Sequence, residues 1–546
     1  MKSYNTFEGS PLPLVGIAGP RHGPAEAAAA TTAAGAPDPP GPSACPCRCC
    51  RRVQRPSAAI RRQVLVNLAA GLACVAVGSC LGWPSPTLER MSGKYWRWPG
   101  VGFERGGRDG PPRPLSPDEA SWVVSLMDLG IVLGSLPAGW AADRWGRRPV
   151  LLASSPLFAA SWLLVLAAQG PEYLYVARLL QGLASAVAMV VSAMYAGEVS
   201  EDRVRGANST LVAMLLTLGT VVSYAVGPYV SYRSLACALL GLPALFVLFF
   251  CWAPESPYWL LVQGRRLEAE HVLRYLRDAD GCPLRVCAEA DTMEATIMEA
   301  AAAASPGSSV PSGLLASARE LLLVPGPDRT AFALVLGLTS LQALSGSDPM
   351  TAYSAVTLPG GFLLGVNEVV IFFGVVSTLS TGVGMVLIEQ LGRRTLLVTF
   401  AALQFVSLLG SAVYYTLDER TDADLAALRW LPPAALLLYG VAYPIGLGCV
   451  PNALQMEVFS TRVKGLALPA VLVSFNALTF LVSKLYSVVM EAWGKDVAFW
   501  FFTADCLVAV LVAVVCLKET KGKSFHEIQD LLDPRRKRRA TPTWPS

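Results

Sequence analysis

Hydrophobic residues gather along this sequence in runs of about 20, the length that crosses roughly 30 Å of hydrocarbon as a helix. Six such runs precede a long polar stretch and six follow it, which predicts an all-α membrane protein with twelve transmembrane helices. The runs lie near residues 64–81, 122–142, 150–168, 174–196, 207–230, 235–252, 331–353, 369–389, 395–415, 431–450, 466–489 and 497–517.

Basic residues are concentrated in short segments between these runs. Four segments carry, in turn, Arg144 with Arg147 and Arg148, Arg203 with Arg205, Arg393 with Arg394, and Arg462 with Lys464. By the positive-inside rule these segments face the cytoplasm, and an even number of spans then places both termini there as well. We expect a multi-pass protein of the plasma membrane.

Composition narrows the class of function. Hydrophobic residues make up 53% of the chain and charged residues only 15%, which is too apolar for a soluble globular protein. The net charge of +4 is divided among short clusters at the ends of apolar runs, so the bilayer is the expected partner and nucleic acid is not. Because no nucleophile, metal-ligand or phosphate-binding motif occurs, we expect neither an enzyme nor a bound cofactor.

The same pattern predicts the domain organisation. An Ala/Pro/Gly-rich start reads as a disordered cytosolic tail, and the polar stretch between the two sets of spans contains short amphipathic helices. The predicted boundaries are 1–62 for the tail, 63–257 for a first six-helix domain, 258–328 for a cytosolic helical linker, 329–518 for a second six-helix domain and 519–546 for a basic cytosolic tail.

Three motifs occur twice, in the same order, roughly 250 residues apart. "ADRWGRRPV" is matched by "IEQLGRRTL", "YAGEVSEDRVRG" by "QMEVFSTRVKG", and "APESPYWLL" by "LKETKGKSF". In the second pair, Glu198 lies seven residues before Arg205 and Glu457 seven before Lys464. The chain is therefore two copies of a six-helix unit, and parallel repeats of this kind build a transporter whose substrate path runs between the halves.

The repeated charges predict a gating network. Arginines at one helix end and a glutamate from a neighbouring helix can join helices by charge-assisted hydrogen bonds. We expect Arg147 and Arg148 to engage Glu198, Arg205 to engage Glu255, and a matching set in the second half, in bonds that form only when the cytosolic side is closed. The alternative is that the charges mark topology and solvate loop ends. The residues assigned to the network are Asp143, Arg147, Arg148, Glu198, Arg205, Glu255, Glu389, Arg393, Arg394, Glu457, Lys464 and Glu519, with Arg393 and Arg394 expected to engage Glu457.

These motifs, with "GSCLGWPSPTLERM", "ARLLQGLASA" and "PESPYWLL", resemble the sugar porters of the major facilitator superfamily, in particular the facilitative glucose and insect trehalose transporters. The resemblance runs from residue 64 to about residue 528. It implies the major facilitator fold, in which two six-helix domains joined by a cytosolic helical segment expose a central site alternately to the two sides of the membrane.

The resemblance also implies a substrate site, and here the sequence departs from the family. Gln342 and Asn476 match the family's motifs, whereas Asp348 and Ser377 stand where asparagines are expected and Asn452 where a tryptophan is expected. Three further family positions are alanine in this chain: Ala213, Ala343 and Ala477. The candidate substrate-binding residues are Gln342, Asp348, Ser377, Asn452 and Asn476. Interhelical hydrogen bonding is the alternative role for the amides, and the losses fit a different substrate, a larger pocket or no transport.

The favoured function is alternating-access transport of a sugar, hexose or trehalose-like, or of a related polyol, by facilitated diffusion. Two carboxylates, Asp128 and Asp348, lie within predicted spans, where charge is costly and marks a pathway. Protons are therefore a second candidate partner, although the first span lacks the acidic residue that family symporters often place there. A proton-coupled symporter and a non-transporting nutrient sensor remain the alternatives.

The tenth predicted span is the expected gate of the second half. It contains four prolines and three glycines within "LPPAALLLYGVAYPIGLGCVP". Proline removes a backbone donor and glycine tolerates unusual dihedral angles, so this helix is expected to bend. Kinks that serve packing alone are the alternative.

Overall fold

The computed structural model of the chain describes residues 56–91, 113–278, 283–303, 326–359, 365–421, 424–459, 461–523 and 525–532, in which every regular element is a helix. The first half contains α2 (Pro56–Gly82), α3 (Pro84–Met91), α4 (Pro117–Trp145), α5 (Arg147–Leu166), α6 (Pro171–Val199), α7 (Asp202–Val226), η1 (Gly227–Tyr229) and α8 (Tyr232–Phe250). The linker contains α9 (Pro257–Val262), α10 (Arg266–Arg277) and α11 (Pro283–Ala303). The second half contains α13 (Pro327–Leu344), α14 (Ser347–Thr357), α15 (Val366–Leu391), α16 (Arg393–Arg420), η2 (Ala426–Leu428), α17 (Leu431–Ile445), α18 (Val450–Val458), α19 (Thr461–Ala492) and α20 (Lys495–Val515), followed by α21 (Phe525–Leu532).

Twelve helical segments of the described ranges are long and apolar enough to cross a membrane, which confirms the expected number. Each segment overlaps one predicted run, and most of them extend past it because polar residues complete the turns at the helix ends. The segments are Ala58–Leu88, Pro117–Trp145, Arg147–Leu166, Pro171–Val199, Arg203–Tyr229, Tyr232–Phe250, Pro327–Thr357, Val366–Leu391, Arg393–Arg420, Ala426–Val458, Leu466–Ala492 and Lys495–Val515.

Three of the spans are broken into two helices. The first breaks between α2 and α3, just before Pro84, and the seventh breaks between α13 and α14 at Gly346, whose φ of +84° suits glycine. The tenth breaks between α17 and α18, where Gly448 donates its N–H to the carbonyl of Tyr443 at 2.8 Å. The bend expected in the tenth span from its prolines and glycines is therefore present.

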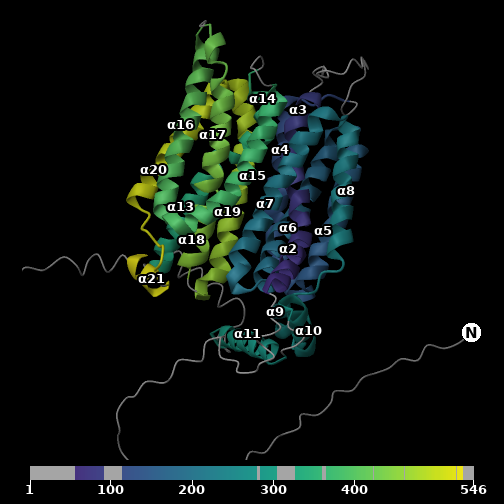
Figure 1. Ribbon diagram of the computed structural model, residues 1–546. Coiled ribbons are helices and arrows are strands. Elements are labelled where there is room, and N and C mark those ends of the chain that lie inside the picture. Colours follow the sequence, from purple (N-terminus) through teal and green to yellow (C-terminus); the bar gives the residue numbers. More distant parts are fainter. Residues whose placement is uncertain are drawn as a thin grey trace, which may run out of the picture. The chain divides into compact units, whose positions relative to one another are not determined.

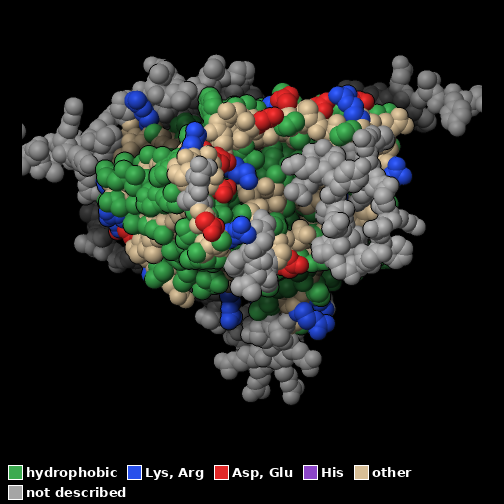
Figure 2. Space-filling model, turned by 90° about the horizontal axis from the view of Figure 1, so that it is seen from above, with side chains coloured by type: hydrophobic (Ala, Val, Ile, Leu, Met, Phe, Trp, Pro, Cys, Tyr) green, Lys and Arg blue, Asp and Glu red, His purple; other side chains and the backbone are tan. Residues whose placement is uncertain are grey.

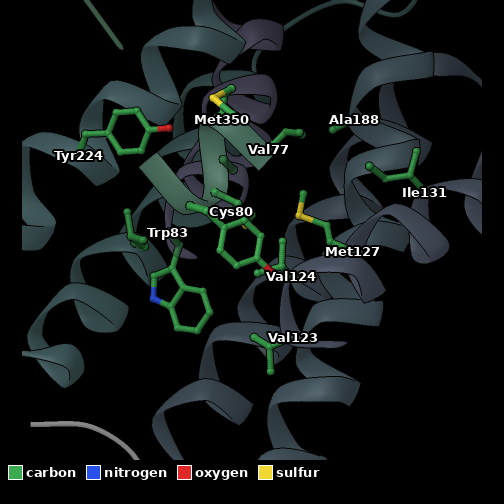
Figure 3. Packing of buried hydrophobic residues seen from close by; sticks show 14 of the residues in the cluster. Val77, Cys80, Trp83, Val123, Val124, Met127, Ile131, Ala188, Tyr224 and Met350 are labelled. Atoms are coloured by element: carbon green, nitrogen blue, oxygen red, sulfur yellow. The ribbon is translucent and has the colours of Figure 1, made fainter. Parts of the chain in front are cut away.

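Small residues let the helices of the first half approach closely. A Cβ placed on Gly130 of α4 would lie 2.8 Å from the Cα of Gly182 in α6, so only glycine fits at this crossing. Around it, Cys80 of α2 and Trp83, which follows α2, pack with Val124 and Met127 of α4 in one buried cluster (Figure 3). The same cluster includes Met350 of α14, so part of the second half packs into it (Figure 3).

The two halves meet along α4 with α19, α7 with α15, and α3 with α14. Helices α9, α10 and α11 lie together at one end of the spans, here called the linker end, and α3 and α14 lie at the opposite end, here called the α3/α14 end (Figure 1). The linker is tied to the first half, because the buried side chain of Arg277 bonds Glu289 at 2.8 Å and the carbonyl of Val199 at 2.9 Å.

Candidate functional site

A buried arginine organises the charge cluster of the first half. Arg147 begins α5, and its guanidinium donates two hydrogen bonds to Glu198 of α6, from Nη2 at 2.8 Å and from Nε at 2.9 Å. Its Nη1 donates to the carbonyl of Ala142 at 3.0 Å and pairs with Asp143 at 3.1 Å. One side chain therefore joins α4, α5 and α6.

Glu255, which follows α8, completes this cluster through backbone donors. Its carboxylate accepts from the N–H groups of Arg147 at 3.0 Å, Arg148 at 3.1 Å and Ser256 at 2.8 Å. Gly146, with a φ of +100°, leaves the room that this carboxylate occupies, since a Cβ there would collide with Glu255 Oε2. Burial raises the pKa of Glu255 even though the backbone donors and Arg147 favour the ionised form.

The second half repeats the main bonds of this construction. Arg393 donates to Glu457 at 2.7 Å from Nη2 and to the carbonyl of Ile388 at 3.2 Å from Nη1. Glu519 accepts from the N–H groups of Arg393 at 2.9 Å and Arg394 at 3.1 Å, and Gly392 takes the place of Gly146 with a φ of +88°. Burial alone would raise the pKa of Glu519, but four backbone N–H donors outweigh it and the pKa ends below its ordinary value.

The second arginine of each pair does not bind the glutamate expected for it. Arg148 Nη2 donates to the carbonyl of Cys251, and Arg394 Nη2 donates to the carbonyl of Val514 at 2.7 Å. In each half the second arginine side chain points toward the C-terminal end of the sixth span, α8 or α20. The last carbonyls of a helix have no partner within the helix, so they accept from the guanidinium.

One further expectation about the network is wrong. Arg205 Nε donates to the carbonyl of Gly197 at 3.1 Å, while Glu255 is occupied by the backbone donors described above. Each cluster forms within one half of the molecule, and the expected dependence of its bonds on closure of the cytosolic side stays a prediction. Glu389 is exposed near Gly206 of the other half, and the side chain of Lys464 lies outside the described part of the chain.

The candidate substrate residues all lie in the second half. Gln342 is buried in the last turn of α13, Asp348 lies in the first turn of α14 with Ser347 Oγ 3.4 Å from its Oδ1, and Ser377 faces Gly440 of α17. Asn476 is buried and donates to the carbonyl of Leu472 at 2.8 Å, one turn earlier on α19. In the described residues no hydrogen bond joins any two of the five candidates.

Asn452 is the weakest of these candidates. It is exposed, its amide donates to the carbonyl of Gly448 at 2.8 Å, and its oxygen accepts from Gln455 at 3.2 Å. The amide is therefore engaged along its own helix. Alignment with the family's tryptophan predicts a binding role for this exposed position of α18, and that role stays a prediction.

Sequence reasoning missed an aromatic pair of the second half and a buried arginine of the first half. The rings of Tyr439 and Tyr443 on α17 stack with centroids 5.7 Å apart and planes 3° apart, just before the break in the tenth span. Arg178 on α6 is buried and donates to the carbonyls of Cys80 and Val123 at 2.7 Å each. A charge inside a predicted span was the available signal for Arg178.

Two cavities accompany these features. One of about 20 Å³, room for a single water, is enclosed by α14, α16, α17 and α20 and is lined in part by Ser354, Ser407 and Tyr439. The other, about 630 Å³, lies at the linker end between Trp145, Glu255 and His271. Neither is lined by the five candidate substrate residues.

Comparisons with known proteins identify the family. Residues 108–532 match the model of the family described as sugar (and other) transporter. The chain is 26% identical over 481 residues to a facilitated trehalose transporter of Apis mellifera ligustica, covering 88% of this chain and 90% of that one. It is 27% identical over 490 residues to the facilitated glucose transporter member 8 of solute carrier family 2 from Bos taurus, covering 86% and 94%.

A solved structure agrees on the fold. The inward-open conformation of the xylose transporter XylE from E. coli matches with a TM-score of 0.66 and 17% identity, covering 85% of this chain and 99% of that one. At this identity the likeness concerns the fold, which is the major facilitator fold of twelve transmembrane helices. The chain is thus a multi-pass membrane protein and a transporter rather than an enzyme, and it belongs to the sugar (and other) transporter family.

Proposed function

We propose that this protein carries a neutral hexose, a trehalose-like disaccharide or a related polyol across the plasma membrane by facilitated diffusion. The observation that carries the proposal is the duplicated charge cluster, which binds three helical segments of each half to one another. Halves stiffened in this way can rock as units about a central site, as alternating access requires. The names of the trehalose and glucose transporters among its relatives support the substrate class.

The orientation follows from charge. Both clusters and the basic segments around Arg147 and Arg393 belong to the linker end, so we assign that end, and with it both termini, to the cytoplasm. The α3/α14 end is then extracellular. This assignment rests on the positive-inside rule.

The site residues suit a polyhydroxyl substrate. Gln342 and Asn476 offer amides that donate and accept, Ser377 offers a hydroxyl, and Asp348 lies at the unwound Gly346. We assign these four side chains to the substrate path. The stacked Tyr439 and Tyr443 lie on α17 just before the break between α17 and α18, and they give the path an aromatic wall.

The assignment is tested by uptake of labelled trehalose and glucose into vesicles containing the purified protein. Gln342→Ala and Asn476→Ala should each reduce uptake about tenfold or more, as expected when a hydrogen bond to substrate is lost. Gln263→Ala, the same chemical change at an exposed linker position, should leave uptake unchanged. Equal uptake by all three variants would contradict the assignment, and no uptake by the parent for any sugar would favour the sensor alternative.

Proton-coupled symport is the second candidate, and one observation favours it. Each half places one carboxylate inside a membrane span, Asp128 buried on α4 and Asp348 in the first turn of α14, and acidic groups at such positions are typical of proton pathways. The E. coli neighbour is itself named a proton:xylose symporter. Uptake measured with and without a pH gradient separates the two candidates, because facilitated diffusion predicts no accumulation against the sugar gradient. If coupling exists, Asp348→Asn should retain downhill uptake and lose any pH dependence between about pH 5 and 7.

A further inference from the structure

A lysine lies inside a membrane span of the second half and reaches the first half. Lys484 of α19 has only 16% of its side chain exposed, and an ammonium at such a position needs partners. Its Nζ donates to Asp118 Oδ1 at 2.6 Å and to Ser121 Oγ at 2.7 Å. The same Nζ lies 4.4 Å from the ring centre of Trp122. All three partners belong to the first turns of α4.

The start of α4 is built to hold these partners in place. Ser116 caps the helix: its Oγ accepts from the N–H of Glu119 at 3.2 Å, while its own N–H donates to the Glu119 carboxylate at 2.9 Å. This reciprocal capping box fixes the first turn without using Asp118. The Asp118 carboxylate therefore remains available to the ammonium of the other half.

The contacts of Lys484 with Asp118, Ser121 and Trp122 are here called the Lys484 junction. Contacts one turn to either side of Lys484 add to it. The ring of Phe480 lies 6.2 Å from that of Trp122, and Ser487 Oγ lies 3.5 Å from the carbonyl of Pro117. Positions 480, 484 and 487 share one face of α19, and this face lies on the start of α4. Acidic and basic side chains are next to one another on the surface of this end of the molecule (Figure 2).

The rest of the α3/α14 end is joined by uncharged groups. Ser85 and Ser354 share a hydrogen bond of 3.1 Å between α3 and α14, and Tyr224 of α7 donates to the carbonyl of Thr351 at 2.6 Å. Among the interdomain side-chain contacts described here, the Lys484 junction is the one that combines an ion pair with a cation–π contact. Both depend on the ammonium charge, so a neutral replacement removes them together.

We propose that Lys484, held by Asp118, Ser121 and Trp122, is a clasp that keeps the α3/α14 end closed and sets the balance between the two conformations of the transport cycle. The inference rests on the proposed alternating access, since the halves must separate at this end in part of the cycle. The clusters at the linker end differ in kind: each lies within one half and moves with it, whereas the clasp must break and reform in every cycle.

The clasp is tested by the accessibility of the neighbouring interface, which needs no transported substrate. Ser354 is buried against Ser85, so a cysteine introduced as Ser354→Cys reacts with a thiol reagent only when this end opens. The rate is measured on the full-length protein in nanodiscs, after subtraction of the labelling of the parent, which has its own cysteines. Lys484→Met and Asp118→Asn should each raise the labelling rate at residue 354 by about threefold or more, the size expected for a partly buried ion pair with a cation–π contact.

The chain provides a matched control. Lys495 lies at the same end but contacts the carbonyl of Thr357 and the ring of Tyr415, both in its own half, so Lys495→Met should leave the rate unchanged. The exchanged pair Asp118→Lys with Lys484→Asp should return the rate toward that of the parent. An unchanged rate in both Asp118→Asn and Lys484→Met, or an equal rise in Lys495→Met, would overturn the clasp. Because labelling does not depend on sugar, a failure of the substrate assignment would leave this result standing.

Discussion

The two charge clusters share one hydrogen-bonding pattern but differ in how far their side chains are exposed to solvent. The side chain of Arg147 is 5% exposed and that of its counterpart Arg393 is 16% exposed, while Glu198 and Glu457 are 16% and 27% exposed. In the first half, Trp259 of α9 covers the cluster and donates its indole N–H to the carbonyl of Asp143 at 2.8 Å. In the second half, α21 contributes Gln529, which donates to the carbonyl of Val458 at 2.7 Å.

This difference in burial changes what identical bonds do. Backbone donors surround both Glu255 and Glu519. At Glu255 the effect of burial is larger than that of the donors and raises the pKa, whereas at Glu519 the donors have the larger effect and lower the pKa. The repeat therefore preserves geometry while its surroundings set the electrostatic response. We expect the first-half cluster to carry more of the stability and the second-half cluster to depend more on the ionised carboxylate.

Removing the central arginine should give the largest contrast. Arg147→Ala leaves the partly buried Glu198 without its buried cation, and breaking such a pair costs up to about 3–5 kcal/mol. Arg393→Ala should cost clearly less, because water can reach Glu457. The measurement is the apparent melting temperature in detergent, with Arg233→Ala, an exposed arginine on α8, as the control. Equal losses for the two cluster variants would contradict the burial difference.

The glycines before the two arginines test the comparison through the backbone. Gly146→Ala and Gly392→Ala both force a side chain into φ near +100° and +88°, at a cost of about 1–3 kcal/mol each. A Cβ at 392 would lie 2.7 Å from Glu519 Oε2, and one at 146 would lie closer still to Glu255 Oε2. We expect a larger drop in apparent melting temperature for Gly146→Ala. Gly264→Ala, at a positive φ in open space, reports the cost of the dihedral angle alone.

The sequence was sufficient for the fold and for the pairs Arg147–Glu198 and Arg393–Glu457, but not for the partners of Arg148, Arg205 and Arg394. Apolar runs and duplicated motifs fix the number and order of helices, because hydrophobic length and repeat spacing are local properties. The partner of an arginine at a helix end depends instead on which carbonyls remain free nearby, so Arg148 and Arg394 bind Cys251 and Val514. Sequence patterns carry no record of that geometry.

The substrate path was predictable only through family alignment. Gln342 and Asn476 occupy buried positions, but Asn452, placed by the same alignment, is exposed. The clasp was still harder to predict from the sequence, because Lys484 and Asp118 are 366 residues apart and only the packing of α4 on α19 brings them together. The lysine inside a predicted span was a signal, yet nothing in the sequence named its partner.

Opposite pKa shifts predict opposite pH responses in the two halves. Ionised Glu255 is disfavoured by burial, so its contribution to stability declines as the pH rises from the ordinary value of 4.5 toward the raised pKa. The contribution of Glu519 is present above 4.5 and is lost as the pH falls toward the lowered pKa. Relative to the parent, the apparent melting temperature of Glu255→Gln should improve between about pH 4 and 7, and that of Glu519→Gln should worsen. Parallel changes in the two variants would break the comparison.

The hydroxyl that supports each glutamate should give the smallest contrast. Ser256 Oγ donates to Glu198 Oε2 and also accepts from the N–H of Trp259 at 3.2 Å as the cap of α9, whereas Thr520 Oγ1 donates to Glu457 Oε2 at 3.0 Å. Ser256→Ala removes a bond to Glu198, the less exposed of the two carboxylates, and also removes a helix cap. Together these are worth about 1–3 kcal/mol. Thr520→Val removes one bond to the more exposed carboxylate of Glu457 and should cost about 1 kcal/mol. Ser256→Thr and Thr520→Ser keep the hydroxyl and serve as controls for shape in the same melting experiment. If Thr520→Val lowered the melting temperature as much as Ser256→Ala, the covering of the first-half cluster by α9 would have no energetic consequence.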